Sequence, residues 1–137
     1  MQIQSPLKVG LKVPVKVTST SKCNFKETSG TAEMIKEAKL FIIDEFTMGH
    51  KDLYETIDRT LKELLGNDLP FGGKVVVLGG DWKQILPVVP FANRPDIVQS
   101  TLKASSLWDH VKILSLTKNM RAIEDEEFAK YLLEVRK

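Results

Sequence analysis

Hydrophobic and polar residues alternate along residues 7–17, where every odd position is apolar and lysine recurs at positions 8, 12 and 16. A period of two is typical of a half-buried strand. Because Pro14 has no N–H donor for a neighbouring strand, we expect an edge strand or an extended arm here. Residues 18–30 are rich in Thr, Ser and Gly, which predicts a flexible connection.

Two short apolar runs further along the chain predict strands. Residues 40–43 read Leu-Phe-Ile-Ile, and residues 75–78 read Val-Val-Val-Leu. A continuous run such as 40–43 suits a strand that is buried on both faces. Between them, residues 50–65 change to a helical period, and the order strand, helix, strand predicts a parallel pair.

Residues 50–65 have the pattern of an amphipathic helix. Apolar side chains recur every three or four residues, and Gly66 follows as a helix terminator. Oppositely charged residues stand four apart on the other face, where we expect them to pair. The apolar positions are Leu53, Ile57, Leu61 and Leu64, and the charged pairs are Glu55 with Arg59 and Asp58 with Lys62.

Weaker patterns complete the predicted architecture. We expect a short helix at about 31–38, helix and loop over 95–107, a third strand at 111–116 and a helix over 125–136. Strands that alternate with helices predict an α/β fold, with a mostly parallel sheet flanked by helices.

Length and composition limit the class of protein. A chain of 137 residues with 42% apolar residues fits one domain or part of one, and global disorder is excluded. The apolar runs are far shorter than the roughly 20 residues that a membrane span needs, and the first residues lack the pattern of a secretory signal. The single cysteine, Cys23, excludes an internal disulfide and a multi-cysteine zinc site. We therefore expect an intracellular protein without a membrane partner.

The formal net charge of +2 is unevenly distributed. Residues 1–26 contain five lysines and no acid, whereas residues 122–137 contain five acids against three bases. A basic arm can follow the phosphates of a nucleic acid. A solvated lysine face on an ordinary strand explains the same residues slightly better.

Polar residues follow each of the three predicted strands. In open α/β sheets, ligands bind beyond the carboxyl ends of the strands, so these residues are expected to converge. They are Asp44 and Glu45 after the first strand, Gly80, Asp81 and Gln84 after the second, and Asn119 and Arg121 after the third.

The residue types at this edge suit nucleotide hydrolysis. A first carboxylate, Asp44, would hold Mg²⁺ through water, and a second, Glu45, would orient or deprotonate the attacking water. Taken alone, an acidic turn that caps the following helix is the more frequent explanation of this pair. Gln84 can sense a phosphate or position a water, whereas a glycine turn capped by Asp81 is the alternative. Arg121 can stabilise charge on a transferred phosphate, or pair with the nearby acids at 124–127.

The sequence of these segments resembles a known family. Residues 40–48 read Leu-Phe-Ile-Ile-Asp-Glu-Phe-Thr-Met, residues 79–87 read Gly-Gly-Asp-Trp-Lys-Gln-Ile-Leu-Pro, and residues 116–121 read Leu-Thr-Lys-Asn-Met-Arg. They resemble ATP-dependent DNA helicases of the Pif-one type, most of all the eukaryotic and Helitron-transposon copies. The resemblance covers about residues 30–125, and it implies the first of two RecA-like motor domains.

The resemblance also implies roles for individual residues. Asp44 would be the Mg²⁺ ligand and Glu45 the catalytic base of the Walker B motif. Asp81 and Gln84, with Gly80 beside them, would belong to the third helicase motif, which couples the γ-phosphate to DNA, and Arg121 would be the arginine finger of the fourth. ATP would be the substrate and single-stranded or forked DNA the partner. The family implies genome maintenance (DNA repair, recombination, telomere maintenance) or mobile-element replication, in the nucleus or in mitochondria.

The departures from the family concern what these 137 residues lack. Gly73-Lys74 is followed by Val75, so a Walker A loop for the β- and γ-phosphates is missing, and so is the second motor domain. In RecA-like sheets the Walker A strand is central, lying between the strands that match 75–79 and 111–116. We therefore expect a basic arm and connection at 1–30 and a partial helicase domain at 31–137. The upstream segment and the second motor domain would be needed for a full site.

Three functions are compatible with these observations. The first is an ATP-dependent DNA helicase in a truncated form, with little activity of its own. The second is a non-catalytic remnant that binds nucleic acid through the lysine-rich arm, and the third is an α/β domain whose acids only cap helices.

Trp82 could stack on a base or plug the edge of the sheet, and Trp108 is assigned to the core. A metal site built from Cys23, His50 and His110 is improbable.

Overall fold

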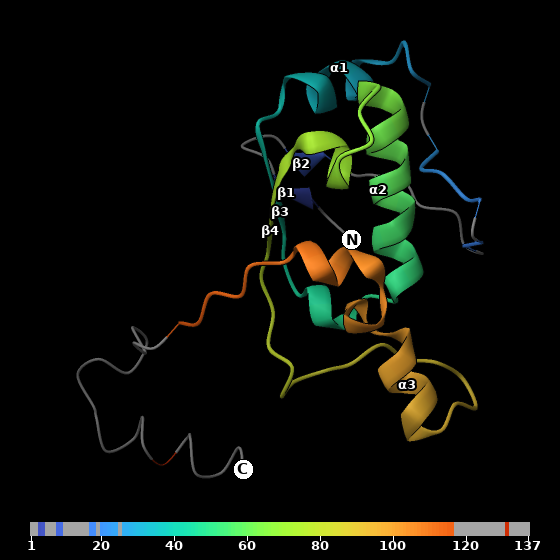
Figure 1. Cartoon of the computed structure of the whole chain (residues 1–137), viewed down its shortest axis with the longest axis vertical. Helices are drawn as coiled ribbons and strands as arrows, with labels where there is room; N and C mark the ends of the chain where they lie inside the picture. The colour runs from blue at the N-terminus through green and yellow to red at the C-terminus, as the bar shows by residue number, and fades with distance from the viewer. Residues whose placement is uncertain are drawn as a thin grey trace.

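The computed structural model describes residues 3–4, 8–9, 17–18, 20–24, 26–116 and 131 of the chain. Its sheet has the strand order β2-β1-β3-β4 (Figure 1). The bounds are Ile3–Gln4 for β1, Lys8–Val9 for β2, Leu40–Ile43 for β3 and Val75–Leu78 for β4. The predicted parallel pair is confirmed, because β3 and β4 run parallel with Leu40 opposite Val75 and Ile43 opposite Leu78.

The β3–β4 pair is covered on one face only. Phe41 and Ile43 of β3 are buried, whereas Leu40 and Ile42 are 42% and 40% exposed. In Figure 1, the long helix α2 (Lys51–Leu65) stands on one side of these strands. The prediction that the strand at 40–43 is buried on both faces was therefore wrong. No helix among the described residues packs against the second face, so its apolar side chains remain in contact with solvent.

Helix α2 confirms the predicted amphipathic segment. The side chain of His50 accepts a hydrogen bond from Asp52 N–H at the start of the helix, and Gly66, with φ of 60°, ends it in the left-handed conformation. Ile57 and Leu61 are buried against the sheet, and Tyr54 is fully buried. The helix thus supplies much of the core between itself and β3.

The charged face of α2 differs in part from its prediction. Asp58 and Lys62 form the expected ion pair, with 2.8 Å between Oδ2 and Nζ. Asp58 is buried, however, because its Oδ1 also accepts the Phe71 backbone N–H at 2.6 Å and so holds the turn η2 (Pro70–Gly73) against the helix. Glu55 and Arg59 form no ion pair with each other. Glu55 accepts the Ser105 hydroxyl at 2.6 Å, and Arg59 donates Nε–H to the Ser21 carbonyl at 3.1 Å.

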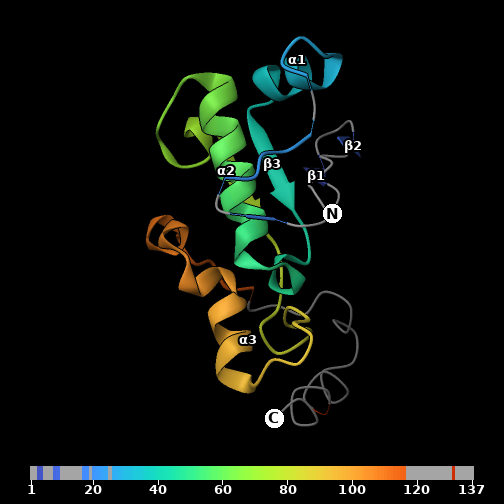
Figure 2. The same cartoon turned by 90° about the vertical axis from the view of Figure 1, so that its right-hand side faces the viewer.

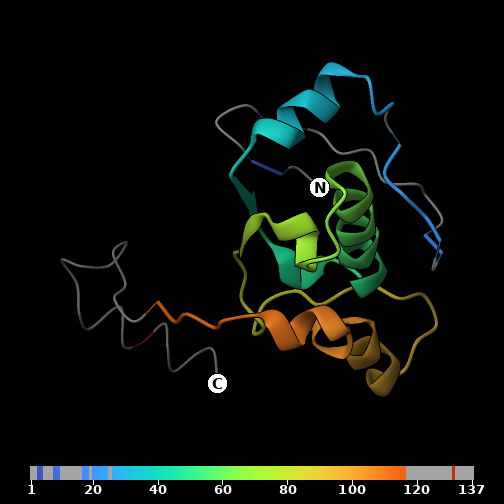
Figure 3. The same cartoon turned by 45° about the horizontal axis from the view of Figure 1, so that its top comes forward.

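The segment after β4 contains helices and loop, as predicted for 95–107. Helix α3 (Arg94–Ser100) is followed by the short turns η3 (Leu102–Ala104) and η4 (Ser106–His110), which pack below α2 in Figure 3. Both turns contribute a buried leucine, Leu102 and Leu107, to the core. They therefore close the end of the core that lies beneath the carboxyl ends of the strands.

The predicted third strand at 111–116 is not formed. These residues are neither helix nor strand, and Ile113, Leu114 and Leu116 are 70%, 81% and 102% exposed. The physical reason is that no strand among the described residues lies beside them to accept their backbone hydrogen bonds. Asn119, Arg121 and, except for Tyr131, the predicted helix at 125–136 lie outside the described residues.

The N-terminal part confirms two predictions. The short helix expected at about 31–38 is α1 (Gly30–Glu37), capped by the Ser29 side chain. Strand β2 is an edge strand, as expected for this stretch, and the other residues of 7–16 lie outside the described part.

The connection at 18–30 is anchored to α2, which its composition did not indicate. Cys23 is buried, and its backbone N–H donates to Thr60 Oγ1 at 2.9 Å. Figure 2 shows this segment crossing α2. None of the helices in the described part is long and apolar enough to cross a membrane.

Candidate functional site

The carboxyl ends of β3 and β4 form one continuous edge. Asp44 and Glu45 follow β3, and Gly79 follows β4. Gly79 N–H donates to the Ile43 carbonyl at 2.8 Å, and Phe46 N–H donates to the Gly79 carbonyl at 3.0 Å. These reciprocal bonds join the two loops directly. The structure therefore brings together two of the three polar groups that the sequence predicted at this edge.

The acidic pair sits on an unusual backbone. Glu45 has φ of 52° and ψ of 38°, the left-handed conformation, just before the turn η1 (Phe46–Met48). Its N–H donates to Asp44 Oδ1 at 2.9 Å, and both side chains are exposed. A non-glycine residue in this conformation costs about 1–2 kcal/mol. Such strain concentrates at functional sites.

The glycines after β4 permit the close approach of the two loops. A Cβ on Gly79 would lie 3.3 Å from Asp44 Oδ1, and a Cβ on Gly80 would lie 2.8 Å from Cδ1 of Phe46. The sequence suggested that these glycines admit a ligand. In the structure they admit the neighbouring loop, which leaves little room between the backbone at Gly80 and the Phe46 ring.

Asp81 and Gln84 form a compact turn at the same edge. Asp81 Oδ1 accepts the Lys83 N–H at 2.9 Å, and its Oδ2 accepts a hydrogen bond from Gln84 Nε2 at 3.2 Å. The Gln84 N–H donates to the Asp81 carbonyl at 3.0 Å. The exposed Gln84 amide is thereby held on the Asp81 carboxylate. This arrangement keeps a neutral donor and acceptor group on the loop that follows β4.

Behind the edge lies a group of rings that the sequence did not predict. We refer to Phe46, Trp82 and Trp108 as the aromatic cluster. The Phe46 and Trp82 rings meet edge to face at 5.1 Å, and the Trp82 and Trp108 rings at 5.8 Å. Lys103 Nζ lies 4.4 Å from the centroid of the Trp82 ring. Trp82 and Trp108 both pack against the core. This was expected for Trp108, and for Trp82 it favours a plug at the sheet edge over the alternative of a base-stacking ring. No period in the sequence could have indicated the cluster, because its members come from three separate loops.

Tyr54 ties helix α2 to the loop of the acidic pair. Its hydroxyl donates to the Phe46 carbonyl at 2.6 Å. The side chain is completely buried, and burial raises the pKa of Tyr54 to about 12. A methyl group on Gly49 would overlap this ring, so Gly49 leaves the space that the hydroxyl occupies.

The residues at the edge are compatible with Mg²⁺ bound together with a nucleotide. Carboxylate oxygens are suitable hard ligands, and Mg²⁺ usually keeps several waters and binds one or two carboxylates plus phosphate oxygens. In the described part of the chain, no group of three or more His, Cys, Asp or Glu side chains is placed to hold a metal by itself. Asp44 thus fits as a partial ligand whose ion would need phosphate and water for the remaining positions.

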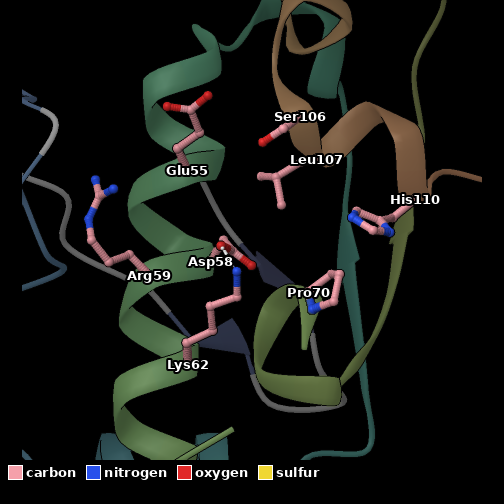
Figure 4. A pocket seen from close by; sticks show the side chains of 8 residues that line it. All are labelled: Glu55, Asp58, Arg59, Lys62, Pro70, Ser106, Leu107 and His110. Atoms are coloured by element: carbon pink, nitrogen blue, oxygen red, sulfur yellow. Dashed lines mark ion pairs between the residues drawn. The ribbon is translucent and has the colours of Figure 1, made fainter. Parts of the chain in front are cut away.

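A hollow of about 300 Å³ lies elsewhere, between α2, η2 and η4 (Figure 4). Its walls include the charged face of α2 and His110, and it includes no residue of the strand edge. The acids in it already have partners, since Asp58 binds Lys62 and the Phe71 N–H, and Glu55 binds Ser105. We therefore place the candidate site at the open strand edge.

Comparisons with known proteins identify the family to which the chain is similar. The sequence pattern of the PIF1-like helicase family matches residues 7–137. The ATP-dependent DNA helicase Pif1 of Psychrobacter sp. is 32% identical over 79 residues, which are 58% of this chain and 12% of that protein.

Solved structures of the same kind have a similar fold. The Pif1 helicase from Bacteroides in complex with ADP-AlF3 and single-stranded DNA superposes with a TM-score of 0.70 at 29% identity, covering 88% of this chain and 29% of that one. A structure of two coordinating Pif1 helicases at forked double-stranded DNA has a TM-score of 0.65 at 30% identity, covering 82% and 29%. The chain therefore spans less than a third of each of these proteins.

Proposed function

The chain belongs to the PIF1-like helicase family, and we propose that it supplies the Walker B and third-motif part of the ATP-hydrolysing site of a DNA helicase. The observation that carries this proposal is the joined edge of β3 and β4. Hydrogen bonds of 2.8 Å and 3.0 Å hold the loop of Asp44 and Glu45 against the loop that begins at Gly79.

Each residue would have a distinct role in hydrolysis. When bound with nucleotide, Mg²⁺ neutralises charge on the phosphates, and Asp44 would hold it through water. Glu45 would orient the attacking water and accept its proton, since its side chain is exposed and its hydrogen bond to Asp44 uses the backbone N–H. Gln84 would exchange its bond to Asp81 for a γ-phosphate oxygen and so report the state of the nucleotide to the loop. Arg121, outside the described residues, is proposed as the arginine finger.

The proposed nucleic-acid partner is single-stranded or forked DNA. The structures with a similar fold include a Pif1 helicase bound to single-stranded DNA and two Pif1 helicases acting at forked double-stranded DNA. We propose for this chain the same partners, with Mg²⁺ and ATP. We also propose a role in genome maintenance (DNA repair, recombination, telomere maintenance) or in mobile-element replication, in the nucleus or in mitochondria.

Nucleotide binding by the whole chain tests the proposal. A fluorescent ATP analogue is titrated into the purified chain with Mg²⁺ and again with EDTA. We expect saturable binding that depends on Mg²⁺ and that Asp44→Asn abolishes, while Glu45→Gln retains binding. Asp68→Asn is the matched control, because Asp68 is an exposed acid in a turn remote from the edge. Equal binding by Asp44→Asn and the unmodified chain would contradict the assignment, and so would a folded chain without Mg²⁺-dependent binding.

DNA binding by the same purified chain distinguishes the proposed function from the alternative, a non-catalytic remnant that binds nucleic acid. That alternative predicts DNA binding that is sensitive to salt, unaffected by Glu45→Gln and by nucleotide, and weakened by neutralising Lys8, Lys12 and Lys16. If DNA affinity instead changes when the Mg²⁺–nucleotide complex is added, the edge and the DNA contact are coupled, as a helicase requires.

A further inference from the structure

The loop between β4 and α3 presents a phenylalanine on a tight turn. Ala92 N–H donates to the Val89 carbonyl at 3.2 Å, with Pro90 at the second position of the turn and Phe91 at the third. Phe91 has φ of 60°. Turns with proline at the second position and positive φ at the third strongly favour glycine there. A bulky side chain in a disfavoured conformation suggests a role for the side chain itself.

The Phe91 ring makes little contact with the rest of the described structure. Its exposure is 110%, equal to or above that of an extended peptide, whereas Phe41, Phe46 and Phe71 are all buried. Val88 in the same loop is 88% exposed. Prolines at 87, 90 and 95 restrict the loop, so the exposed ring is held on a stiffened backbone. The ring is therefore available to a partner at a low entropic cost.

The charge around the loop favours a polyanionic partner. Residues 82–95 contain Lys83 and Arg94, both exposed, and no aspartate or glutamate. Asp81 and Asp96 border this stretch, and their carboxylates accept hydrogen bonds within their own turn and helix cap. Arg94 stands three residues after Phe91, within reach of the phosphates that flank a base stacked on the ring. An exposed aromatic ring beside cations is the arrangement by which proteins bind single-stranded nucleic acid without reading its sequence.

We propose that Phe91 is a stacking platform for a base of single-stranded nucleic acid, with Arg94 beside it on the phosphate backbone. The inference rests on the proposed function, and it assigns one contact of the DNA partner to a named residue. Trp82 was the aromatic ring that the sequence suggested for stacking, but Lys103 lies over its face, and its ring packs against Phe46 and Trp108. Phe91, in the loop before α3, has by contrast a fully exposed ring.

The test separates contacts with bases from contacts with phosphates. It measures the binding of DNA oligomers with and without bases to the unmodified 137-residue chain and to variants at position 91. Fluorescence anisotropy measures binding of a labelled oligodeoxythymidine and of an abasic oligomer of equal length. We expect Phe91→Ala to weaken binding to oligodeoxythymidine about 5- to 150-fold, which corresponds to a base-stacking energy of about 1–3 kcal/mol. Phe91→Tyr should retain the affinity, and Phe91→Leu should lose it, since leucine is apolar but has no aromatic face. The abasic oligomer should bind all four proteins equally.

Each result decides between distinct explanations. If Phe91→Ala binds oligodeoxythymidine as tightly as the unmodified chain, the platform is refuted while DNA binding stands. Full affinity of Phe91→Leu would show an apolar contact of the kind a protein partner makes, and this also refutes stacking. If the unmodified chain binds neither oligomer, the result refutes DNA as the partner in the proposed function, and with it the role of Phe91. Circular dichroism checks that each variant is folded. We expect all of them to fold, because the exposed Phe91 side chain contributes no packing to the core.

Discussion

The hydrogen bond from Tyr54 to the Phe46 carbonyl is the contact between the core and the candidate site that is most directly testable. Tyr54→Phe removes only the hydroxyl, which donates at 2.6 Å from a completely buried position. The ring, its packing in α2 and the space beside Gly49 are otherwise kept. The variant therefore isolates one polar contact behind the acidic pair.

The magnitude follows from what the Phe46 carbonyl retains. Gly49 N–H also donates to this oxygen, at 3.1 Å, so the carbonyl is not left without a partner. The loss should therefore be that of a net hydrogen bond, about 0.5–1.5 kcal/mol, and not the larger cost of an orphaned buried group. For a small domain with an m value of roughly 1–3 kcal/mol/M, a loss of about 1 kcal/mol lowers the urea midpoint by about 0.3–1 M.

The raised pKa of Tyr54 provides a second measurement, the dependence of the stability on pH, and it fixes the direction of that dependence. Burial raises it from 10.0 to about 12, so the folded state holds the proton more tightly than the unfolded state. The corresponding stability is fully present below about pH 10 and is lost as the pH rises through about 12. We expect the unmodified chain to lose more stability over this interval than Tyr54→Phe, because phenylalanine does not titrate.

The assay is urea unfolding followed by circular dichroism, at neutral pH and between pH 10 and 12. The matched control is Tyr131→Phe, the other tyrosine, whose side chain is 61% exposed and should tolerate the change. An unchanged midpoint for Tyr54→Phe would refute the hydrogen bond. A loss far above 1.5 kcal/mol would refute the argument that Gly49 keeps the carbonyl satisfied.

Two further changes test the packing at the strand edge. Gly80→Ala should destabilise the chain by about 1–3 kcal/mol in urea unfolding, because its Cβ would lie 2.8 Å from the Phe46 ring, whereas Gly30→Ala, with nothing within 4 Å, should not destabilise it. Lys103→Met should shift the tryptophan emission and cost about 0.5–1 kcal/mol, because both tryptophans lie in the aromatic cluster and the cation over Trp82 is removed. Emission identical to that of the unmodified chain would contradict this contact, and Lys83→Met is the control.

The helix and the strands that depend on local sequence were predictable from the sequence alone. The period of 50–65, the terminating Gly66 and the runs at 40–43 and 75–78 predicted α2, β3 and β4, because each depends on neighbours a few residues away. The order of these elements predicted a parallel pair. Two parallel strands end at the same edge, so the position of Asp44 and Glu45 beside Gly80 and Asp81 was also predictable, as was the likeness to a helicase family carried by these motifs.

Contacts between distant segments explain where the predictions failed. The apolar run at 40–43 suggested a strand buried on both faces, but a run cannot show whether a second layer exists to cover it, and Leu40 and Ile42 remain exposed. A spacing of four suggested that Glu55 pairs with Arg59. Their actual partners, Ser105 and Ser21, come from loops far away in the sequence. Residues 111–116 have the composition of a strand, yet a strand requires a neighbour for its hydrogen bonds.

The sequence by itself determined which segments become helix or strand and which carboxylates follow the strands, because these depend on local periodicity and connection order. Only the tertiary structure decided the left-handed backbone of Glu45, the buried bond of Tyr54, the aromatic cluster under Lys103 and the exposed ring of Phe91. The Tyr54 bond and the aromatic cluster depend on packing between segments that are separate in the sequence, and no local pattern encodes that proximity. The backbone at Glu45 lies where two loops are joined, and Phe91 is exposed because no other described segment covers it.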